Sequence, residues 1–167
     1  MLVVEGWSPD YALEWAVEEF DRGQYDLLIA AGGPMDRGSL VSGYPTYADI
    51  AAATLGRLGI DPARLATAPA EATLRNRTHV SARGVRELLD SHAVEARGLN
   101  LVSVGTHARR SWVVYRKTLG DQCPVGILSV PPEHYDPARW WTSSAGVKGT
   151  IVETLGWLYE SLFDGGR

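Results

Sequence analysis

Short apolar segments alternate along the chain with longer segments of helical periodicity. The apolar segments have the length of buried strands and lie at residues 2–4, 26–31, 65–68, 99–104 and 125–130. The segments between them repeat apolar positions as helices that pack on one face do, and they lie at residues 9–20, 46–58, 73–91 and 106–119. Strands that alternate with helices predict right-handed crossovers and a parallel sheet. We therefore expect an α/β fold: a three-layer, Rossmann-like open sheet, mainly parallel, of about five strands with helices on both faces.

Capping residues predict where several helices begin. Ser8 is expected to be an N-cap, with Pro9 at the first helical position. Thr73 is expected to cap the helix that follows it, and Ser143 or Ser144 to cap a terminal helix. The apolar stripe of that terminal helix is expected to face the core and consists of Val147, Ile151, Leu155, Leu158 and Leu162.

Composition indicates one soluble domain. The 167 residues have the size of an ordinary domain, and they show no repeat, low-complexity segment or linker. Hydrophobic residues make up 45% of the chain and charged residues 22%, as in globular proteins. The net charge of −4 argues against non-specific nucleic-acid binding, which needs a basic surface. We expect a single domain over residues 1–167 with no nucleic-acid partner.

The sequence also bears on compartment and metal. Cys123 is the one cysteine, so no disulfide can form within the chain, and this fits a reducing compartment. No Cys/His spacing is that of a zinc site, so no metal is expected. No basic and apolar leader opens the chain, and no apolar run approaches the length of a membrane span. We expect a cytoplasmic protein, unless an anchor outside this sequence holds it at a membrane.

The strongest candidate site follows the apolar segment 99–104. There the chain continues Gly105-Thr106-His107-Ala108-Arg109-Arg110. In open parallel sheets, ligands bind where strands end and helices begin. A helix N-terminus beside arginines favours an anion, and a histidine is a potential general acid or base. The alternative is structural, with Thr106 as an N-cap, a hydrogen-bonded histidine and arginines in solvent.

Two other strand ends carry candidate ligand-binding residues. Glu5, Gly6 and Trp7 follow the first strand, where the carboxylate suits a ribose or amino group and the glycine lets backbone approach a ligand. The alternatives there are a solvated carboxylate and a tryptophan plugging the core. Gly32 and Gly33 follow the second strand and either cradle a phosphate or turn the chain. Their spacing is neither that of a phosphate loop nor that of a dinucleotide fingerprint, which argues against a standard nucleotide triphosphatase or dehydrogenase.

The segment Thr73-x-x-Asn76-Arg77 opens a predicted helix. Capping by Thr73 explains it without a ligand. In the functional alternative, Asn76 or Arg77 points across the strand ends at the ligand. His79 has no partner at a recognisable spacing and is expected to be structural or on the surface.

In order and spacing, these motifs resemble the YdcF/SanA/ElyC family of bacterial proteins over nearly the whole chain. The resemblance rests on Val3-Val4-Glu5-Gly6-Trp7, Ala31-Gly32-Gly33, Thr73-x-x-Asn76, Gly105-Thr106-His107-x-x-Arg110, Trp140-Trp141-x-Ser143-Ser144 and Glu153. It implies a Rossmann-like fold with a pocket at the carboxyl ends of the strands and a link to cell-envelope processes. In one branch of the family, binding of S-adenosylmethionine is proposed. Arg75 and Tyr47 depart from the family pattern, because acidic residues often stand at those positions.

The resemblance also ranks the candidate residues. It favours Asn76 over its neighbour Arg77, and Arg110 over Arg109. It suggests that Glu153 contributes to the pocket or braces an arginine. Periodicity alone places Glu153 opposite the apolar stripe of its helix, in solvent.

Two functions follow as hypotheses. In the first, an anionic or nucleotide-like metabolite, with S-adenosylmethionine as one candidate, binds at the strand ends. Arg110, with Arg109, would hold the anionic group, while Glu5 and Asn76 would bond polar parts of the ligand. In the second, the protein is a hydrolase or transferase acting on a phosphorylated cell-envelope precursor, with His107 as acid/base and Glu5 as the other catalytic candidate. A non-catalytic interaction domain would have an apolar crevice at the strand ends instead.

Overall fold

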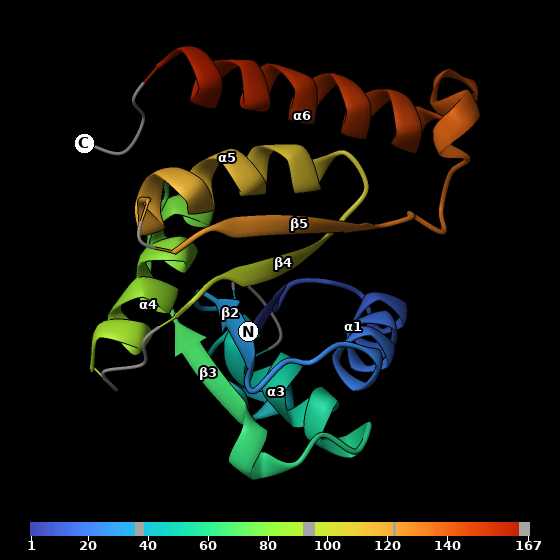
Figure 1. Ribbon diagram of the computed structural model, residues 1–167. Helices are drawn as coiled ribbons and strands as arrows, with labels where there is room; N and C mark the ends of the chain where they lie inside the picture. The colour runs from blue at the N-terminus through green and yellow to red at the C-terminus, as the bar shows by residue number, and fades with distance from the viewer. Residues whose placement is uncertain (36–38, 92–95, 122, 164–167) are drawn as a thin grey trace.

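The computed structural model describes residues 1–35, 39–91, 96–121 and 123–163. Its centre is a parallel sheet of five strands in the order β3-β2-β1-β4-β5 (Figure 1). The strands are β1 Leu2–Glu5, β2 Leu28–Gly32, β3 Leu65–Pro69, β4 Leu99–Val104 and β5 Val125–Val130. The predicted three-layer, Rossmann-like α/β fold is confirmed.

Helices cover both faces of the sheet. One face packs against α1 (Asp10–Arg22) and α3 (Tyr47–Arg57), and the other against α4 (Arg77–Ser91) and α5 (His107–Leu119). The last helix, α6 (Ser144–Leu162), lies on the outside of α5 (Figure 1). The short helical segments are α2 (Ser39–Ser42), η1 (Pro62–Arg64) and η2 (Pro137–Thr142).

Alternation along the strands builds a separate core on each face of the sheet. On β1, Leu2 and Val4 belong to the core beneath α1 and α3, whereas Val3 belongs to the core beneath α4 and α5. All three are fully buried, as expected of a sheet covered on both faces. The same alternation turns Glu5 toward α4 and α5.

The strand order reverses between β1 and β4. From β1 the chain builds outward through β2 to β3, and α4 then carries it back to β4 on the other side of β1. In open α/β sheets, ligands bind in the crevice at such a reversal, beyond the carboxyl ends of the strands. Glu5 ends β1 and Gly105 follows β4, so the fold brings these two motifs to one crevice.

Two predicted helix starts are wrong. The first helix begins one residue after Pro9, and the hydroxyl of Ser8 is buried without a hydrogen-bond partner among the described residues. The helix α4 begins at Arg77 rather than beside Thr73. The hydroxyl of Thr73 instead accepts a hydrogen bond from the N–H of Arg75 at 3.1 Å and donates one to its carbonyl oxygen at 2.6 Å. A local turn of this kind satisfies the threonine and competes with helix capping.

The predicted orientation of the terminal helix is also wrong. Ser143 caps α6 as expected, accepting a hydrogen bond from the N–H of Gly146 at 3.0 Å. The stripe expected to face the core is mostly exposed, however: Leu155 is 62% and Leu162 73% exposed. The side of α6 that turns inward carries small and polar residues, among them Gly146, Gly149, Glu153, Gly156 and Glu160.

Ion pairs and close approach explain this orientation of α6. Glu153 pairs with Arg110 and Glu160 pairs with His79, so both carboxylates need the inner face. A Cβ at Gly156 would lie 2.7 Å from Cδ of Arg110, so a larger residue there would force the paired Arg110 side chain to shift. The buried face of α6 is thus the one whose carboxylates find partners on α4 and α5. No helix within the described ranges is long and apolar enough to cross a membrane.

Candidate functional site

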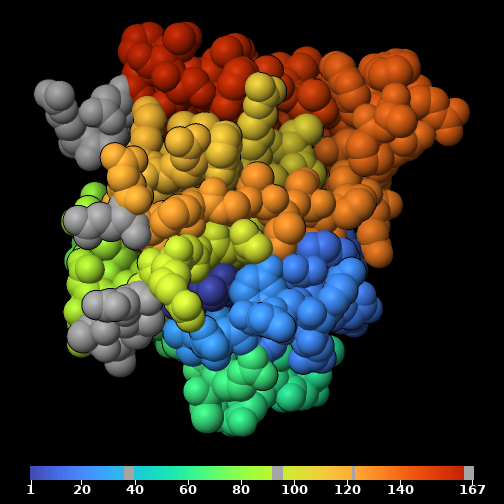
Figure 2. Space-filling model, viewed as in Figure 1, coloured from blue at the N-terminus to red at the C-terminus, as the bar shows by residue number. Residues whose placement is uncertain are grey.

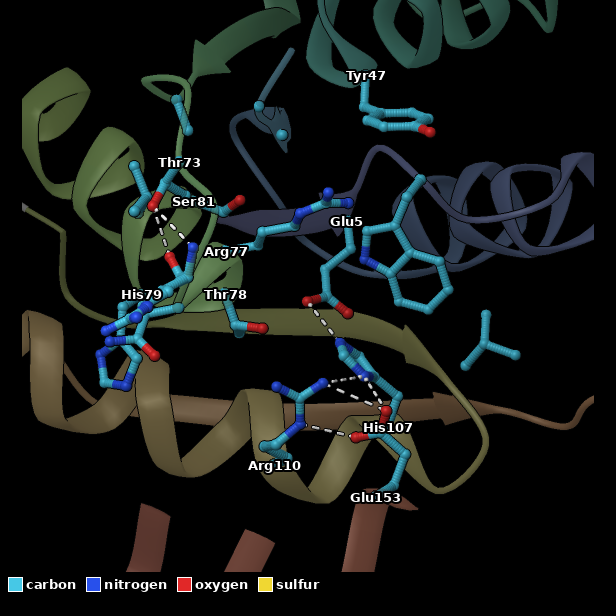
Figure 3. A pocket seen from close by; sticks show the side chains of 18 of the residues that line it. Glu5, Tyr47, Thr73, Arg77, Thr78, His79, Ser81, His107, Arg110 and Glu153 are labelled. Atoms are coloured by element: carbon cyan, nitrogen blue, oxygen red, sulfur yellow. Dashed lines mark hydrogen bonds and ion pairs between the residues drawn. The ribbon is translucent and has the colours of Figure 1, made fainter. Parts of the chain in front are cut away.

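A tight turn brings the start of α5 to the end of β1. Gly105 has a φ of +54°, a left-handed conformation that glycine adopts without strain, and it turns the chain from β4 into α5. Its N–H donates to the carbonyl oxygen of Val130 at 2.9 Å, which ties the turn to β5. His107 is consequently the first residue of α5, and its side chain faces Glu5 (Figure 3).

The carboxylate of Glu5 is buried among donors. Glu5 is only 2% exposed, which excludes the alternative of a strand-end carboxylate in solvent. The hydroxyl of Ser103 on β4 donates to Oε2, and that of Ser111 on α5 donates to Oε1 at 2.8 Å. Nε2 of His107 lies 3.4 Å from Oε1. Partners of this kind offset the cost of removing a charged carboxylate from water.

His107 connects Glu5 to a second carboxylate. Its Nδ1 lies 3.1 Å from Oε1 of Glu153 on α6. Arg110, one turn further along α5, donates from Nε to Oε2 of Glu153 at 2.7 Å and from Nη2 to Oε1 at 3.2 Å. These four side chains, Glu5, His107, Glu153 and Arg110, form a charged row in which negative and positive groups alternate (Figure 3).

The charged row keeps His107 protonated. Burial alone would lower the pKa of His107, but the negative charge of Glu5 and the close contacts of the two ring nitrogens with Glu153 and Glu5 raise the pKa to about 9. Burial would raise the pKa of Glu153, yet hydrogen bonds from His107 and Arg110 lower it to about 2. At neutral pH His107 is therefore an imidazolium between two carboxylates. Its 3.0 Å contact with Nη2 of Arg110 then joins two donors and is no hydrogen bond.

A cavity of about 940 Å³ opens over the charged row. Its wall is built from the ends of β1, β2 and β4, the loop before α4, and parts of α3, α4, α5 and α6. The structure brings most of the residues predicted from the sequence into this lining: Glu5, Trp7, Gly32, Gly33, Thr73, Asn76, Arg77, Gly105, Thr106, His107, Arg110 and Glu153. Segments far apart in the chain thus share one concave surface.

Gly6 and Arg109 lie outside this lining, contrary to the prediction. A Cβ on Gly6 would come within 2.4 Å of the backbone oxygen of Tyr47, so the glycine makes room for α3 and not for a ligand. Gly32 serves the same contact, since its Cβ would lie 2.8 Å from Cβ of Tyr47. The guanidinium of Arg109 stacks on the ring of Trp157 of α6, 3.5 Å from its centroid.

Trp7 and Thr106 both belong to the cavity wall. Trp7 is 42% exposed, and its ring stands edge-on to the His107 imidazole with the centroids 4.8 Å apart. A core plug would be buried. Thr106 occupies the N-cap position of α5, but its side chain makes no capping hydrogen bond.

Asn76 and Arg77 enter the cavity from the start of α4. Asn76 has a φ of 55°, the one left-handed backbone outside glycine among the described residues. Asparagine tolerates this conformation better than most residues do. The carbonyl oxygen of Asn76 accepts from the N–H of Val80 at 3.1 Å, so the turn leads directly into α4. The side chain of Arg77 extends into the cavity, where Figure 3 shows it reaching toward the end of β1.

Two serines that donate hydrogen bonds to Glu5, Ser103 and Ser111, were not predicted from the sequence, although the position of each gives an indication. Ser103 is a polar residue inside an otherwise apolar strand and is fully buried. Ser111 stands one helical turn after His107 and is fully buried too. A buried hydroxyl needs a partner, which here is a carboxylate.

A second histidine–carboxylate pair also lines the cavity. Nε2 of His79 on α4 lies 2.8 Å from Oε2 of Glu160 on α6, and both residues are buried. Of the two positions expected for His79, structural or on the surface, its burial excludes the surface one. The two residues are 81 positions apart, so no local spacing could reveal the pair.

Comparisons of the chain with protein-family models, with curated proteins and with solved structures found no match. Within the part of the chain that the structure describes, no group of three or more His, Cys, Asp or Glu side chains is arranged to hold a metal ion. The geometry of the cavity is thus the basis for a functional assignment.

Proposed function

We propose that this protein binds a small metabolite that carries an anionic group, nucleotide-like in size, at the carboxyl edge of the sheet. The observation that carries the proposal is the cavity of about 940 Å³ with the charged row as its floor. Small-molecule sites in proteins commonly measure about 300–1,000 Å³ and hold a few convergent polar groups. The charged lining also argues against a pure interaction domain, for which an apolar crevice is expected.

The lining favours a ligand with both an anionic group and hydrogen-bond donors. Arg77 and Arg110 offer guanidinium groups to a carboxylate or phosphate. In this proposal Arg77 binds the anionic group, because its side chain extends into the cavity. Glu5 and Glu153 would accept hydrogen bonds from hydroxyl or amino groups. A polyanion matches this lining less well, because two carboxylates lie in its floor.

S-adenosylmethionine, the candidate that the family resemblance implies, has charged groups that match the arginines and carboxylates of this lining. Its amino and sulfonium groups are cationic and suit the carboxylates, while its own carboxylate suits an arginine. In this arrangement Arg77 holds the carboxylate, and Glu5 accepts from the amino group or a ribose hydroxyl. When bound, such a cofactor supplies an activated methyl group.

Titration calorimetry with S-adenosylmethionine, AMP and glucose 6-phosphate tests the proposal. At least one of them should bind, and Arg77→Gln should weaken that binding by about 10- to 100-fold, because a charged hydrogen bond is lost. Arg109→Gln is the matched control, since this arginine lies outside the cavity and its loss should leave the affinity unchanged. Absence of binding by all three ligands, or equal losses in both variants, contradicts the proposal.

The protonation of His107 supports a second candidate function, a hydrolase or transferase acting on a phosphorylated cell-envelope precursor. An imidazolium with a pKa of about 9 holds its proton at neutral pH beside the cavity. In this candidate reaction it protonates the departing oxygen as the bond to phosphorus breaks, while water or an acceptor hydroxyl attacks the phosphorus and releases its proton to solvent. The arginines stabilise the charge that develops on the phosphoryl oxygens.

Release of inorganic phosphate from a sugar phosphate, or of a nucleoside monophosphate from a nucleotide sugar, tests this second candidate. Replacement His107→Gln should lower the rate by about 10²- to 10⁴-fold, the usual contribution of general acid catalysis. The rate of the unaltered protein should fall as the pH passes about 9, where His107 loses its proton. His134→Gln is the control, because His134 also lines the cavity but lies outside the charged row. A rate that is unchanged in His107→Gln eliminates this candidate and leaves the binding proposal intact.

A further inference from the structure

The helix α6 is the outermost element at one edge of the molecule. Its inner side contacts α5 and η2, and no other element covers its outer side in Figures 1 and 2. That outer side holds large apolar side chains, each more than a third exposed, which we call the α6 apolar face: Ile151, Val152, Leu155, Leu158, Tyr159, Leu162 and Phe163.

The α6 apolar face is large for a solvent-exposed surface. Its residues are 39% to 73% exposed. With side chains of roughly 150–250 Å², these exposures leave on the order of 700 Å² of mainly apolar surface on one side of one helix. The largest apolar patch of a typical monomer measures about 300–600 Å², whereas each side of a stable protein interface measures about 800 Å². The area therefore matches what a stable dimer buries.

The acidic side chains of α6 do not lie on this face. Glu153 and Glu160 are its acidic residues, and both side chains turn inward, with exposures of 17% and 7%. Helices that lie on membrane surfaces carry lysines and arginines beside their apolar side. In α6 Lys148 is the single basic residue, and the whole chain has a net charge of −4. An uncharged protein surface suits this face better than an anionic lipid surface does.

The face is complementary to a second copy of itself. Ile151, Leu155, Leu158 and Leu162 are spaced by four, three and four residues, the spacing of a coiled-coil seam. A stripe along one helix pairs with an identical stripe after a two-fold rotation, as isologous dimers require. Lys148 lies three residues before Ile151, at the next position of the seam. A parallel pairing would therefore set two lysines against each other. An antiparallel pairing sets each lysine beside the C-terminal turn of the partner helix, where the helix dipole is negative.

We propose that two copies of this chain form an antiparallel dimer through the α6 apolar face. In this dimer Leu155 packs against Leu158 of the partner subunit, and Ile151 packs against Leu162 of the partner subunit. The inner side of the same helix supplies Glu153 and Glu160 to the cavity. Dimer formation therefore holds in place the helix that completes the cavity of each copy.

Size-exclusion chromatography with light scattering tests the proposal on the full chain. The unaltered protein should have twice its chain mass of 18.2 kDa. Leu155→Glu and Leu158→Glu should each give a monomer, since each places a charge in the apolar seam. Both side chains are exposed in the single chain, so the circular dichroism spectrum should not change. Leu40→Glu is the matched control and should remain dimeric, because Leu40 is fully exposed on α2, outside the α6 apolar face.

A spin label at position 144 tests the orientation, because it leaves Lys148 in place. In Ser144→Cys on a Cys123→Ser background, antiparallel helices place the two labels roughly 37 Å apart along the helix axis, at about 1.5 Å per residue. Parallel helices place them at about the interhelical distance of 8–10 Å, and that result would overturn the antiparallel arrangement. A monomer of 18.2 kDa at all concentrations, or a dimer that survives Leu155→Glu, overturns the proposal as a whole. So does a monomer that binds phosphatidylserine vesicles through Leu155, because the face would then serve a lipid surface.

Discussion

The free energy of unfolding should fall by about 3 kcal/mol as the pH rises from 6.5 through about 9, because His107 loses its proton over this range. Glu5 and Glu153 raise the pKa of His107 in the folded protein above its value in the unfolded chain. The folded protein therefore holds a proton that the unfolded chain has already released. This stabilisation is fully present below pH 6.5 and is lost as the pH passes about 9.

The lowered pKa of Glu153 predicts a second loss of stability, at acid pH. Its pKa is lowered from 4.5 to about 2, so its contribution to stability is present above pH 4.5 and is lost as the pH falls through about 2. Both contributions are complete only between pH 4.5 and pH 6.5. The charged row should therefore stabilise the fold most in this slightly acidic range.

Urea unfolding at a series of pH values measures both limbs. His107→Gln should abolish the alkaline limb, because the variant has no imidazole to titrate. His134→Gln should retain it, since His134 is exposed and lies outside the charged row. Parallel stability curves for the unaltered protein and His107→Gln would show that the row does not hold the proton.

Replacement Glu5→Leu should destabilise the fold by about 3–5 kcal/mol at neutral pH, the cost of breaking a buried ion pair on one side. The change leaves the hydroxyls of Ser103 and Ser111 without their acceptor and deprives the His107 imidazolium of one carboxylate. Above about pH 9 the penalty should shrink, because His107 is then neutral. Denaturant titration at pH 7 and at a pH above 9 measures both values.

Two further variants show whether the loss of stability comes from the buried charge of Glu5. Glu5→Gln removes the negative charge but keeps an oxygen that can accept from a serine hydroxyl. It should therefore lower the free energy of unfolding less than Glu5→Leu does. Glu14→Leu removes an exposed glutamate on α1 and should change the stability by less than about 0.5 kcal/mol. A loss in Glu5→Leu no larger than that in Glu14→Leu would contradict the burial of a partnered charge at Glu5.

Much of the fold is predictable from local pattern. The five strands lie where short apolar segments lie, since a strand covered on both faces must be apolar along its length. The start of α3 is equally local: Thr46 and Asp49 form a reciprocal capping box within four residues. Thr73 shows the limit of such reasoning, because its hydroxyl has a competing partner in the turn before α4.

The candidate site is predictable only in part. The topology rule for parallel sheets brings Glu5 and the Gly105–Arg110 turn to one edge, so their proximity follows from the alternation of strands and helices. The direction of single side chains does not follow. Arg109 and Arg110 are neighbours on one helix, yet one stacks on Trp157 and the other pairs with Glu153.

The sequence by itself determined the strands, the parallel α/β architecture and the edge of the sheet at which polar residues gather, because these depend on periodicity and on short-range capping. Only the tertiary structure decided which face of α6 is buried. Apolar periodicity predicts that Glu153 faces solvent. In the folded chain Glu153 instead faces His107 and Arg110, and Leu155 is exposed. The physical reason is that a buried carboxylate needs a cationic or hydrogen-bonding partner, and Glu153 and Glu160 find theirs on α5 and α4, which are distant in sequence and which no local pattern reveals.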